Sequence, residues 1–258
     1  MILKQKISIL GCGWLGLDLA LNLINKGYNV KGSTTSSNKF ENLKIKAIPA
    51  FIVDIKQREK VVSEFLTSDV LVICITSKSI DDFKCLITQI EKSNIKKVIF
   101  ISSTSVYPNT NEITSEESPI NTSPLTEIES LFRKNKLFQS TIIRFGGLFG
   151  YNRQPGNFFK KDKKIENPEG YINFIHRDDC IEIIEKIIKH NAWNQTLNAC
   201  ADSHPKRRDF YKNEFKKLGK PEPIFNEESL NDYKIITSEK LKNLLNYTFK
   251  YSDLMNYW

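Results

Sequence analysis

The sequence has no long apolar run, and this absence excludes a transmembrane helix. In 258 residues no window approaches the roughly 18 uncharged apolar residues that such a helix needs. The apolar N-terminus is interrupted by Lys4, Gln5 and Lys6, and no small-residue cleavage site follows it. We therefore expect a soluble, cytoplasmic protein with no membrane partner.

Histidine and cysteine are scarce, with three histidines and five cysteines. No Cys-x-x-Cys occurs, the cysteine count is odd, and the histidines have no ligand spacing with the cysteines. Both a disulfide framework and a zinc site are therefore disfavoured, and we expect no metal. Most cysteines lie inside apolar runs such as VLVICI, where a free thiol behaves as a small hydrophobic group.

Acidic residues are fewer than basic ones. The chain has 30 Asp and Glu against 38 Lys and Arg, so its net charge is +8. Such a charge invites a nucleic-acid interpretation. The lysines, however, are spread along the chain and alternate with acidic residues, so we interpret them as a solvated surface and expect no nucleic-acid partner. The same positive charge would also favour the binding of a small anionic ligand.

Short apolar runs alternate with amphipathic ones, a pattern typical of a parallel sheet with helical crossovers. Strands are predicted at 6–10, 28–33, 47–54, 69–75, 96–102, 140–145, 171–176 and 196–200. Helices are predicted at 14–26, 58–66, 79–92, 124–135, 178–190 and 206–218. The predicted fold class is α/β, a Rossmann-type doubly wound parallel sheet with a small mixed C-terminal lobe.

The predicted core spans residues 1–150, with 174–200 returning to it, and the smaller substrate-binding lobe spans 151–258. Residues 103–124 are rich in Ser, Thr, Asn and Pro. This composition predicts a long surface loop, which in a compact domain is more often functional than idle.

Three glycines in the pattern Gly11-x-Gly13-x-x-Gly16 stand between a predicted strand and a predicted helix. In that context the first allows a tight turn, the second lets the backbone approach a pyrophosphate, and the third lets helix and strand pack closely. The turn, with Trp14 and Leu15 in it, is therefore predicted to bind a dinucleotide at the helix N-terminus. A glycine-rich turn without a ligand is the alternative.

The end of the second predicted strand bears on which dinucleotide binds, because a carboxylate there would hydrogen-bond a free ribose 2′-hydroxyl. The chain has no acid at this point until Glu41. Ser33, Thr34 and Thr35 are instead placed to donate to a 2′-phosphate, with Lys39 supplying charge. This favours NADP, with NAD as the alternative.

Other residues near this end of the sheet have two interpretations each. Asp54, after the third predicted strand, either meets an adenine edge or caps the next helix. Thr76, after the fourth, is a further expected cofactor contact. Asn38-x-x-Glu41 resembles a capping box, so some of the neighbouring hydroxyls are local scaffolding in the alternative interpretation.

Three further stretches, ISSTSVYP (101–108), RFGGLFG (144–150) and NFIHRDDC (173–180), resemble the extended short-chain dehydrogenase/reductases (SDRs). GCGWLG (11–16) and SHPKRRDFY (203–211) are most similar to the atypical, YeeZ-like branch of that family. The resemblance covers nearly the whole chain. It implies a Rossmann core, a substrate cleft above the nicotinamide, and a monomer or homodimer.

In active SDRs a Ser or Thr polarises the substrate oxygen and a Tyr in Tyr-x-x-x-Lys transfers the proton. The resemblance places Ser103 in the first role. No tyrosine of this chain has Lys four residues later, and Asn121 and Leu125 stand where the pair is expected. The catalytic dyad of the family therefore cannot be carried over to this chain.

Several residues are candidate substitutes. Tyr107, four residues after the candidate serine, is the first candidate for proton donor. His176 belongs to a residue type that titrates near neutral pH. Arg144, Arg153 and the 206–208 cluster suit an anionic substrate, because guanidinium groups match carboxylate and phosphate. For each of them a packing or surface role is the alternative.

Together these features predict an enzyme of the oxidoreductase or epimerase/dehydratase type, with NADP(H) as cofactor and a small carbonyl or hydroxyl compound as substrate. The missing dyad supports a second hypothesis. In that hypothesis the chain is a non-catalytic NADP(H)-binding sensor or scaffold protein whose partner responds to cofactor occupancy.

Overall fold

The structure is a computed structural model that describes residues 5–57, 63–159 and 163–257. Among these residues seven strands form one sheet in the order β10-β7-β5-β4-β1-β2-β3. The strands are β1 (Lys6–Leu10), β2 (Asn29–Thr34), β3 (Ala50–Ile52), β4 (Val70–Ile73), β5 (Lys97–Ser103), β7 (Gln139–Phe145) and β10 (Thr196–Ala199). The pairings that join β3, β2, β1, β4 and β5 are parallel. The strand order extends from β1 in both directions, which confirms the predicted doubly wound α/β class.

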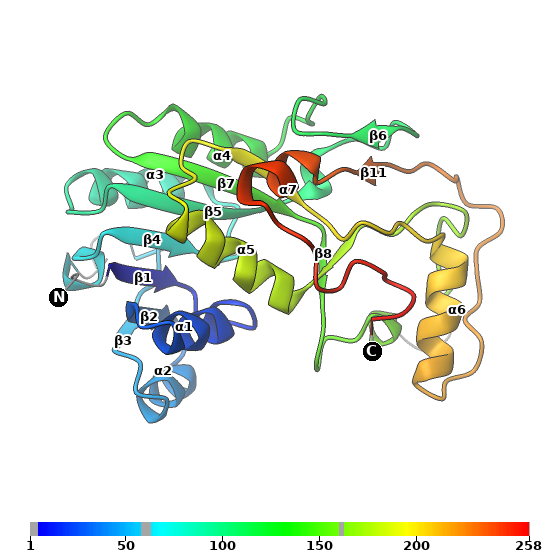
Figure 1. The fold of residues 1–258 in the computed structure, drawn as a ribbon, viewed down its shortest axis with the longest axis horizontal. Helices are drawn as coiled ribbons and strands as arrows, with labels where there is room; N and C mark the ends of the chain where they lie inside the picture. Colours follow the sequence, from blue (N-terminus) through cyan, green and yellow to red (C-terminus); the bar gives the residue numbers. More distant parts are fainter. Residues whose placement is uncertain (1–4, 58–62, 160–162, 258) are drawn as a thin grey trace. The chain divides into compact units, whose positions relative to one another are not determined.

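Helices cover both faces of this sheet (Figure 1). They are α1 (Gly16–Asn25), α2 (Ser37–Ile45), α3 (Ile80–Glu91), α4 (Pro124–Lys134) and α5 (Arg177–Lys189). Helices α3 and α4 lie on one face, and α1 and α5 lie on the other, where Lys26 and Glu185 form a 3.1 Å ion pair. In the described part of the chain, no helix combines the length and the apolar character of a membrane span.

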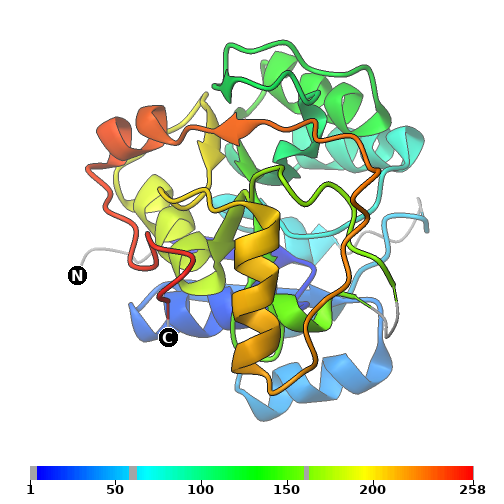
Figure 2. The same ribbon diagram turned by 90° about the vertical axis from the view of Figure 1, so that its right-hand side faces the viewer.

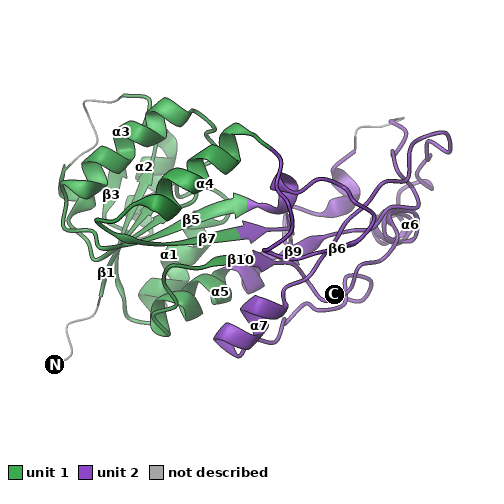
Figure 3. Cartoon of the chain, turned by 90° about the horizontal axis from the view of Figure 1, so that it is seen from above, with its two compact units in different colours: residues 1–102, 122–143, 181–196 green, residues 103–121, 144–180, 197–258 purple. Residues whose placement is uncertain are grey.

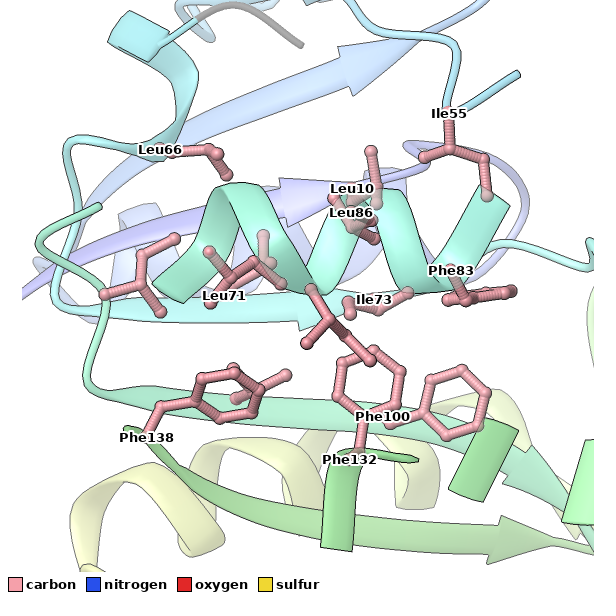
Figure 4. Close-up of a cluster of buried hydrophobic side chains, with 14 of the residues drawn as sticks. Leu10, Ile55, Leu66, Leu71, Ile73, Phe83, Leu86, Phe100, Phe132 and Phe138 are labelled. Atoms are coloured by element: carbon pink, nitrogen blue, oxygen red, sulfur yellow. The ribbon is translucent and has the colours of Figure 1, made fainter. Parts of the chain in front are cut away.

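Strand β4 shows why the central strands are apolar throughout. Leu71 and Ile73 belong to the core cluster under α3 and α4 (Figure 4), whereas Val70 and Val72, which alternate with them, are equally buried. Successive side chains of a strand point to opposite faces, so both faces of β4 are covered. In the same cluster the rings of Phe100 and Phe132 stack with their centroids 5.0 Å apart.

Two helices begin where the sequence predicts, because a serine caps each of them. The Ser79 hydroxyl accepts a hydrogen bond from Asp82 N at 3.4 Å at the start of α3. At the start of α4, Ser123 and Thr126 form a reciprocal capping box, with Pro124 as the first helical residue. Pro is favoured there because its missing N–H has no intrahelical partner in any case.

The sequence pattern does not predict helix α2, because most of its side chains are exposed. Leu43 is its only buried residue, so the segment lacks the apolar stripe by which a helix is recognised. The helix begins at Ser37, so the proposed capping box at Asn38 does not form. Of the helix predicted over 58–66, residues 58–62 lie outside the described residues and Ser63–Leu66 is a 3₁₀ turn, η1.

The chain divides into two compact units (Figure 3). Unit 1 comprises residues 1–102, 122–143 and 181–196, and unit 2 comprises 103–121, 144–180 and 197–258. This division differs from the predicted boundary at residue 150. The difference arises in part because β6 (Ile113–Thr114) pairs with β11 (Ile235–Ile236), which joins the segment predicted as a surface loop to the C-terminal residues.

Unit 2 contains a second short pairing, between β8 (Gly147–Phe149) and β9 (Phe174–His176). It also contains α6 (Arg207–Lys217) and α7 (Glu239–Leu245). After α6 the chain runs back beside that helix to β11 (Figures 1 and 2). An apolar cluster that includes Phe149 and Phe210 forms the core of this unit.

Asp179 ties the C-terminal segment of unit 2 to the beginning of α5. Its carboxylate is fully buried and accepts hydrogen bonds from Tyr247 Oη at 2.6 Å, Lys250 N at 2.7 Å and Tyr251 N at 3.2 Å. A carboxylate that accepts several hydrogen bonds is the form in which a buried charge is tolerated.

Candidate functional site

The three glycines of the β1–α1 turn have different surroundings. Gly11 has a φ of +94°, and a Cβ there would lie 2.6 Å from Ile75 Cγ2 and 3.0 Å from Cys74 O. A Cβ on Gly16 would lie 2.3 Å from Gly11 O, whereas a Cβ on Gly13 would have no atom within 4 Å. The fold itself therefore requires the first and third glycines. The second leaves an open space beside the backbone.

Hydrogen bonds to β2 hold this turn in place. Cys12 N donates to Ser33 O at 2.7 Å, Gly11 N donates to Ser33 Oγ at 3.2 Å, and Gly13 N donates to Gly11 O at 2.8 Å. Burial raises the pKa of the Cys12 thiol to about 12, so this thiol stays neutral. Cys12 therefore has a packing role in the turn.

The open space beside Gly13 lies at the beginning of α1. Leu15, the N-cap residue, makes no side-chain capping bond. The first N–H groups of a helix have no intrahelical partner and attract anions. Trp14 is partly exposed, whereas the side chain of Leu15 is buried. The residues present thus fit a pyrophosphate that approaches the bare backbone at Gly13.

At the end of β2 the structure corrects part of the predicted contact set. Ser33 is fully buried and its hydroxyl accepts the Gly11 N–H. Thr34 is nearly buried and its hydroxyl accepts from Ser36 N at 3.2 Å. Both hydroxyls therefore support the backbone, because a 2′-phosphate cannot reach groups turned inward. Thr35 and Lys39 are exposed, as a contact to such a phosphate requires.

The structure places the two other predicted cofactor contacts near strand ends. Asp54 follows β3 and its carboxylate accepts from Lys56 N at 3.0 Å, which is a local turn bond. Thr76 is exposed and follows β4. Contacts of these side chains to a cofactor stay predictions.

The serines at the end of β5 point in different directions. Ser102 is buried and donates to Glu129 Oε1 at 2.5 Å, and Glu129 is itself fully buried. Ser103 is partly exposed, and its hydroxyl accepts from Ser105 N at 3.1 Å at the beginning of the 3₁₀ turn η2 (Thr104–Val106). Because Ser103 Oγ is the acceptor in that bond, its O–H remains able to donate to a substrate oxygen.

Tyr107, the first candidate for proton donor, lies in the interior of unit 2. It is 1% exposed. Its hydroxyl donates to Asn198 Oδ1 at 2.8 Å and accepts from Arg144 Nη1 at 2.6 Å, and burial raises the pKa of the phenol. A phenol enclosed in this way does not meet a substrate, so the role of proton donor is corrected to a structural one. The same burial corrects Arg144, which is 2% exposed, from a substrate contact to the partner of Tyr107.

Sequence reasoning missed two members of this network. Asn198 is fully buried in β10, and its backbone N–H donates to Glu116 Oε1 at 2.6 Å. A polar residue inside the buried strand TLNAC is a signal that points to Asn198. No comparable signal marks Glu116, which lies in the segment predicted as a surface loop.

The other predicted substrate contacts have separate settings in unit 2. Arg153 is exposed, with its guanidinium 5.7 Å from the Phe158 ring centroid. His176 is buried and accepts from Asp178 N at 3.2 Å, and its ring lies 3.7 Å from that of Tyr251. Burial lowers the pKa of His176 to about 4, so the ring is neutral at physiological pH. The geometry supports a packing role for His176.

The buried network predicts a stability effect for Tyr107→Phe. We expect the free energy of unfolding to fall by about 1–3 kcal/mol, because the buried Arg144 and Asn198 groups each lose a hydrogen-bond partner. Urea unfolding measures this loss, with Tyr28→Phe at a partly exposed phenol as the matched control. Unchanged stability together with lost turnover would restore Tyr107 as a catalytic residue.

Comparison with known proteins agrees with this architecture. Residues 6–121 match the family model described as the NAD binding domain of 6-phosphogluconate dehydrogenase. Protein YeeZ of Escherichia coli K12 is 29% identical over 269 residues, which cover 96% of this chain and 97% of YeeZ. The chain is similar to YeeZ over nearly its whole length, and this similarity supports the predicted resemblance to atypical SDRs. The matched domain and the glycine turn support a nicotinamide dinucleotide as the cofactor class.

Two solved structures share the fold of this chain. A conserved protein of unknown function from Silicibacter pomeroyi DSS superposes with a TM-score of 0.84 at 17% identity, covering 98% of this chain and 96% of that one. UDP-glucuronic acid 4-epimerase from Bacillus cereus, in complex with NAD, superposes with a TM-score of 0.77 at 19% identity, covering 98% and 95%. The predicted Rossmann-type α/β fold is confirmed.

Proposed function

We propose that this SDR-like protein is an NADP(H)-dependent enzyme of the oxidoreductase or epimerase/dehydratase type that acts on a small carbonyl or hydroxyl compound. The observation that carries the proposal is Gly13, where open space adjoins a turn whose other two glycines are required by packing. The bound cofactor supplies hydride transfer at the nicotinamide. Ser103, the last residue of β5, donates its O–H to the substrate oxygen, in the role that the family resemblance implies.

The preference for NADP(H) is supported by the end of β2 and the beginning of α2. No carboxylate occurs there before Glu41, so the usual acceptor for a free 2′-hydroxyl is missing. Thr35 and Lys39 are exposed. Lys39 lies in the first turn of α2, where the helix dipole also favours an anion. A 2′-phosphate would be attracted by the Lys39 ammonium and by the positive end of the α2 dipole.

Titration of NADPH and NADH against tryptophan fluorescence tests this preference. We expect wild-type protein to bind NADPH more tightly, and Lys39→Glu to weaken NADPH binding by about tenfold or more with little change for NADH. Lys44→Glu, an equal charge change at an exposed position of the same helix, is the control. Tighter NADH binding by the wild type, or an equal loss in the control, would contradict the preference.

Turnover tests the role of Ser103. With NADPH and a panel of aldehydes and ketones, Ser103→Ala is expected to lower the rate by about 100-fold or more while the Kd for NADPH stays unchanged. Ser105→Ala, at an exposed serine of the same turn, is expected to keep the rate. Loss of the rate in both variants would indicate a distorted turn and would remove Ser103 from the mechanism.

A second function, a non-catalytic NADP(H)-binding sensor or scaffold, is favoured by one observation. Tyr107, the tyrosine four residues after Ser103, is buried and bonded to Arg144, and the chain has no Tyr-x-x-x-Lys. This function predicts NADPH binding without turnover, and a partner that is captured only when NADPH is present. Capture of the same partner without NADPH would exclude it.

A further inference from the structure

Unit 2 contains a cavity of about 220 Å³ that the proposed function does not use. Its lining comes from Asn109, the 167–174 segment, Arg207 at the beginning of α6, and the 232–234 segment. Most of the lining is polar. Cavities for drug-sized ligands measure about 300–1,000 Å³, so this one suits a smaller molecule.

Lys234 brings one positive charge to this cavity. Its ammonium donates to Tyr107 O at 2.6 Å and, among the described residues, has no carboxylate within ion-pair distance. The side chain is half-buried, and burial lowers its pKa. The nearby charge of Asp232 opposes this shift without forming an ion pair. A partly buried charge that lacks an ion-pair partner would gain from a bound anion.

Arg207 contributes the second positive charge to the lining of the cavity. It differs from Lys206 and Arg208, its neighbours in the sequence, which both pair with carboxylates. Lys206 pairs with Glu169 at 2.9 Å, and Arg208 pairs with Glu169 at 2.8 Å and with Glu227 at 2.7 Å. Lys206 and Arg208 are therefore already paired with carboxylates of the protein. This corrects the expectation that the whole 206–208 cluster binds an anionic substrate. Of the three, only Arg207 lines the cavity.

The guanidinium of Arg207 has neutral partners. Its Nε donates to the backbone carbonyl of Glu166 at 3.1 Å, and its centre lies 5.4 Å from the Tyr211 ring centroid. In the described part of the chain no carboxylate forms an ion pair with it. The cavity therefore has two cations without paired carboxylates, and Asp232 is the one acidic residue of its lining.

Side-chain amides hold the cavity walls together. Asn173 Nδ2 donates to Lys234 O at 2.8 Å, and Asn173 Oδ1 accepts from Ile236 N at 2.9 Å. Asn167 Nδ2 donates to Asp232 O at 2.5 Å. Because these bonds fix the 232–236 segment before any ligand arrives, little ordering is needed on binding.

We propose that this cavity binds a small oxyanion, the carboxylate or phosphate group of a metabolite smaller than a nucleotide sugar, between Lys234 and Arg207. A guanidinium and an ammonium together match two oxygens of such a group. The lining amide of Asn109 and the phenols of Tyr171 and Tyr233 suit neighbouring hydroxyl groups of the same ligand. The proposal requires neither cofactor binding nor turnover.

Titration of the full chain with sodium phosphate and, separately, with sodium acetate tests the proposal. Amide chemical shifts are followed by NMR against sodium chloride at equal ionic strength. We expect saturable binding of at least one oxyanion, weakened by about tenfold or more in both Lys234→Gln and Arg207→Gln. Binding of phosphate alone identifies a phosphate ester as the ligand, and binding of acetate identifies a carboxylate.

The control variants separate site-specific loss from a change of net charge or of fold. Lys240→Gln, at an exposed position of α7, is expected to bind as the wild type does, and Lys234→Arg is expected to bind within about threefold of it. Absence of oxyanion binding by the wild type, or an equal loss in Lys240→Gln, would overturn the proposal. Unchanged NADPH affinity in Lys234→Gln keeps this outcome distinct from failure of the proposed function.

Discussion

Gly13→Ala is expected to weaken NADPH binding by about 10- to 100-fold, the cost of forcing one methyl group into a close contact. The free energy of unfolding is expected to stay within about 0.5 kcal/mol of the wild-type value, because the new methyl group would meet no protein atom within 4 Å. The variant thus removes only the space that the phosphates need. Fluorescence titration and urea unfolding of the same preparation measure the two quantities.

Gly16→Ala supplies the contrast within the same turn. Its Cβ would lie 2.3 Å from Gly11 O, so the helix or the turn must shift, and we expect a loss of about 1–3 kcal/mol of stability. The two alanine variants therefore separate a glycine kept for a ligand from a glycine kept for packing. Wild-type NADPH affinity in Gly13→Ala would show that the open space is not the pyrophosphate site.

Asp179→Ala is expected to cost about 3–5 kcal/mol of stability, because three donors lose one charged, buried acceptor at the same time. The change leaves the Tyr247 hydroxyl and the Lys250 and Tyr251 N–H groups without their acceptor inside the protein. Urea unfolding at neutral pH measures the loss. The C-terminal segment is also expected to become more sensitive to proteolysis.

Asp178→Ala is the matched control, since it removes the same group from the neighbouring position. Asp178 accepts from the hydroxyls of Tyr151 and Tyr251, but its side chain is 25% exposed. Water can replace those bonds, so we expect a loss of about 1 kcal/mol. Equal losses in the two variants would show that Asp179 does not anchor the C-terminal segment.

The elements that the sequence predicts well are those whose cause is local. Strands β4 and β5 are apolar runs, and α4 begins at a serine followed by proline. Helix α2 lacks an apolar stripe, because it buries only Leu43. The pairing of β6 with β11 joins residues that lie far apart in the sequence, so no local pattern in 103–121 announces it.

The candidate site divides in the same way. The glycine turn is recognisable because its requirements lie within six residues of one another. Ser33 is misassigned by sequence because its acceptor role toward Gly11 spans 22 residues, and Tyr107 because its bond to Asn198 spans 91. Whether a hydroxyl turns inward depends on such distant partners, which the spacing of residues does not show.

The interleaving of the two units along the chain has a consequence for synthesis on the ribosome. Unit 1 takes its last stretch from residues 181–196, after the chain has twice left it and returned. The chain must therefore emerge as far as residue 196 before this unit has all of its parts. Contacts closed so late over such sequence separations slow folding.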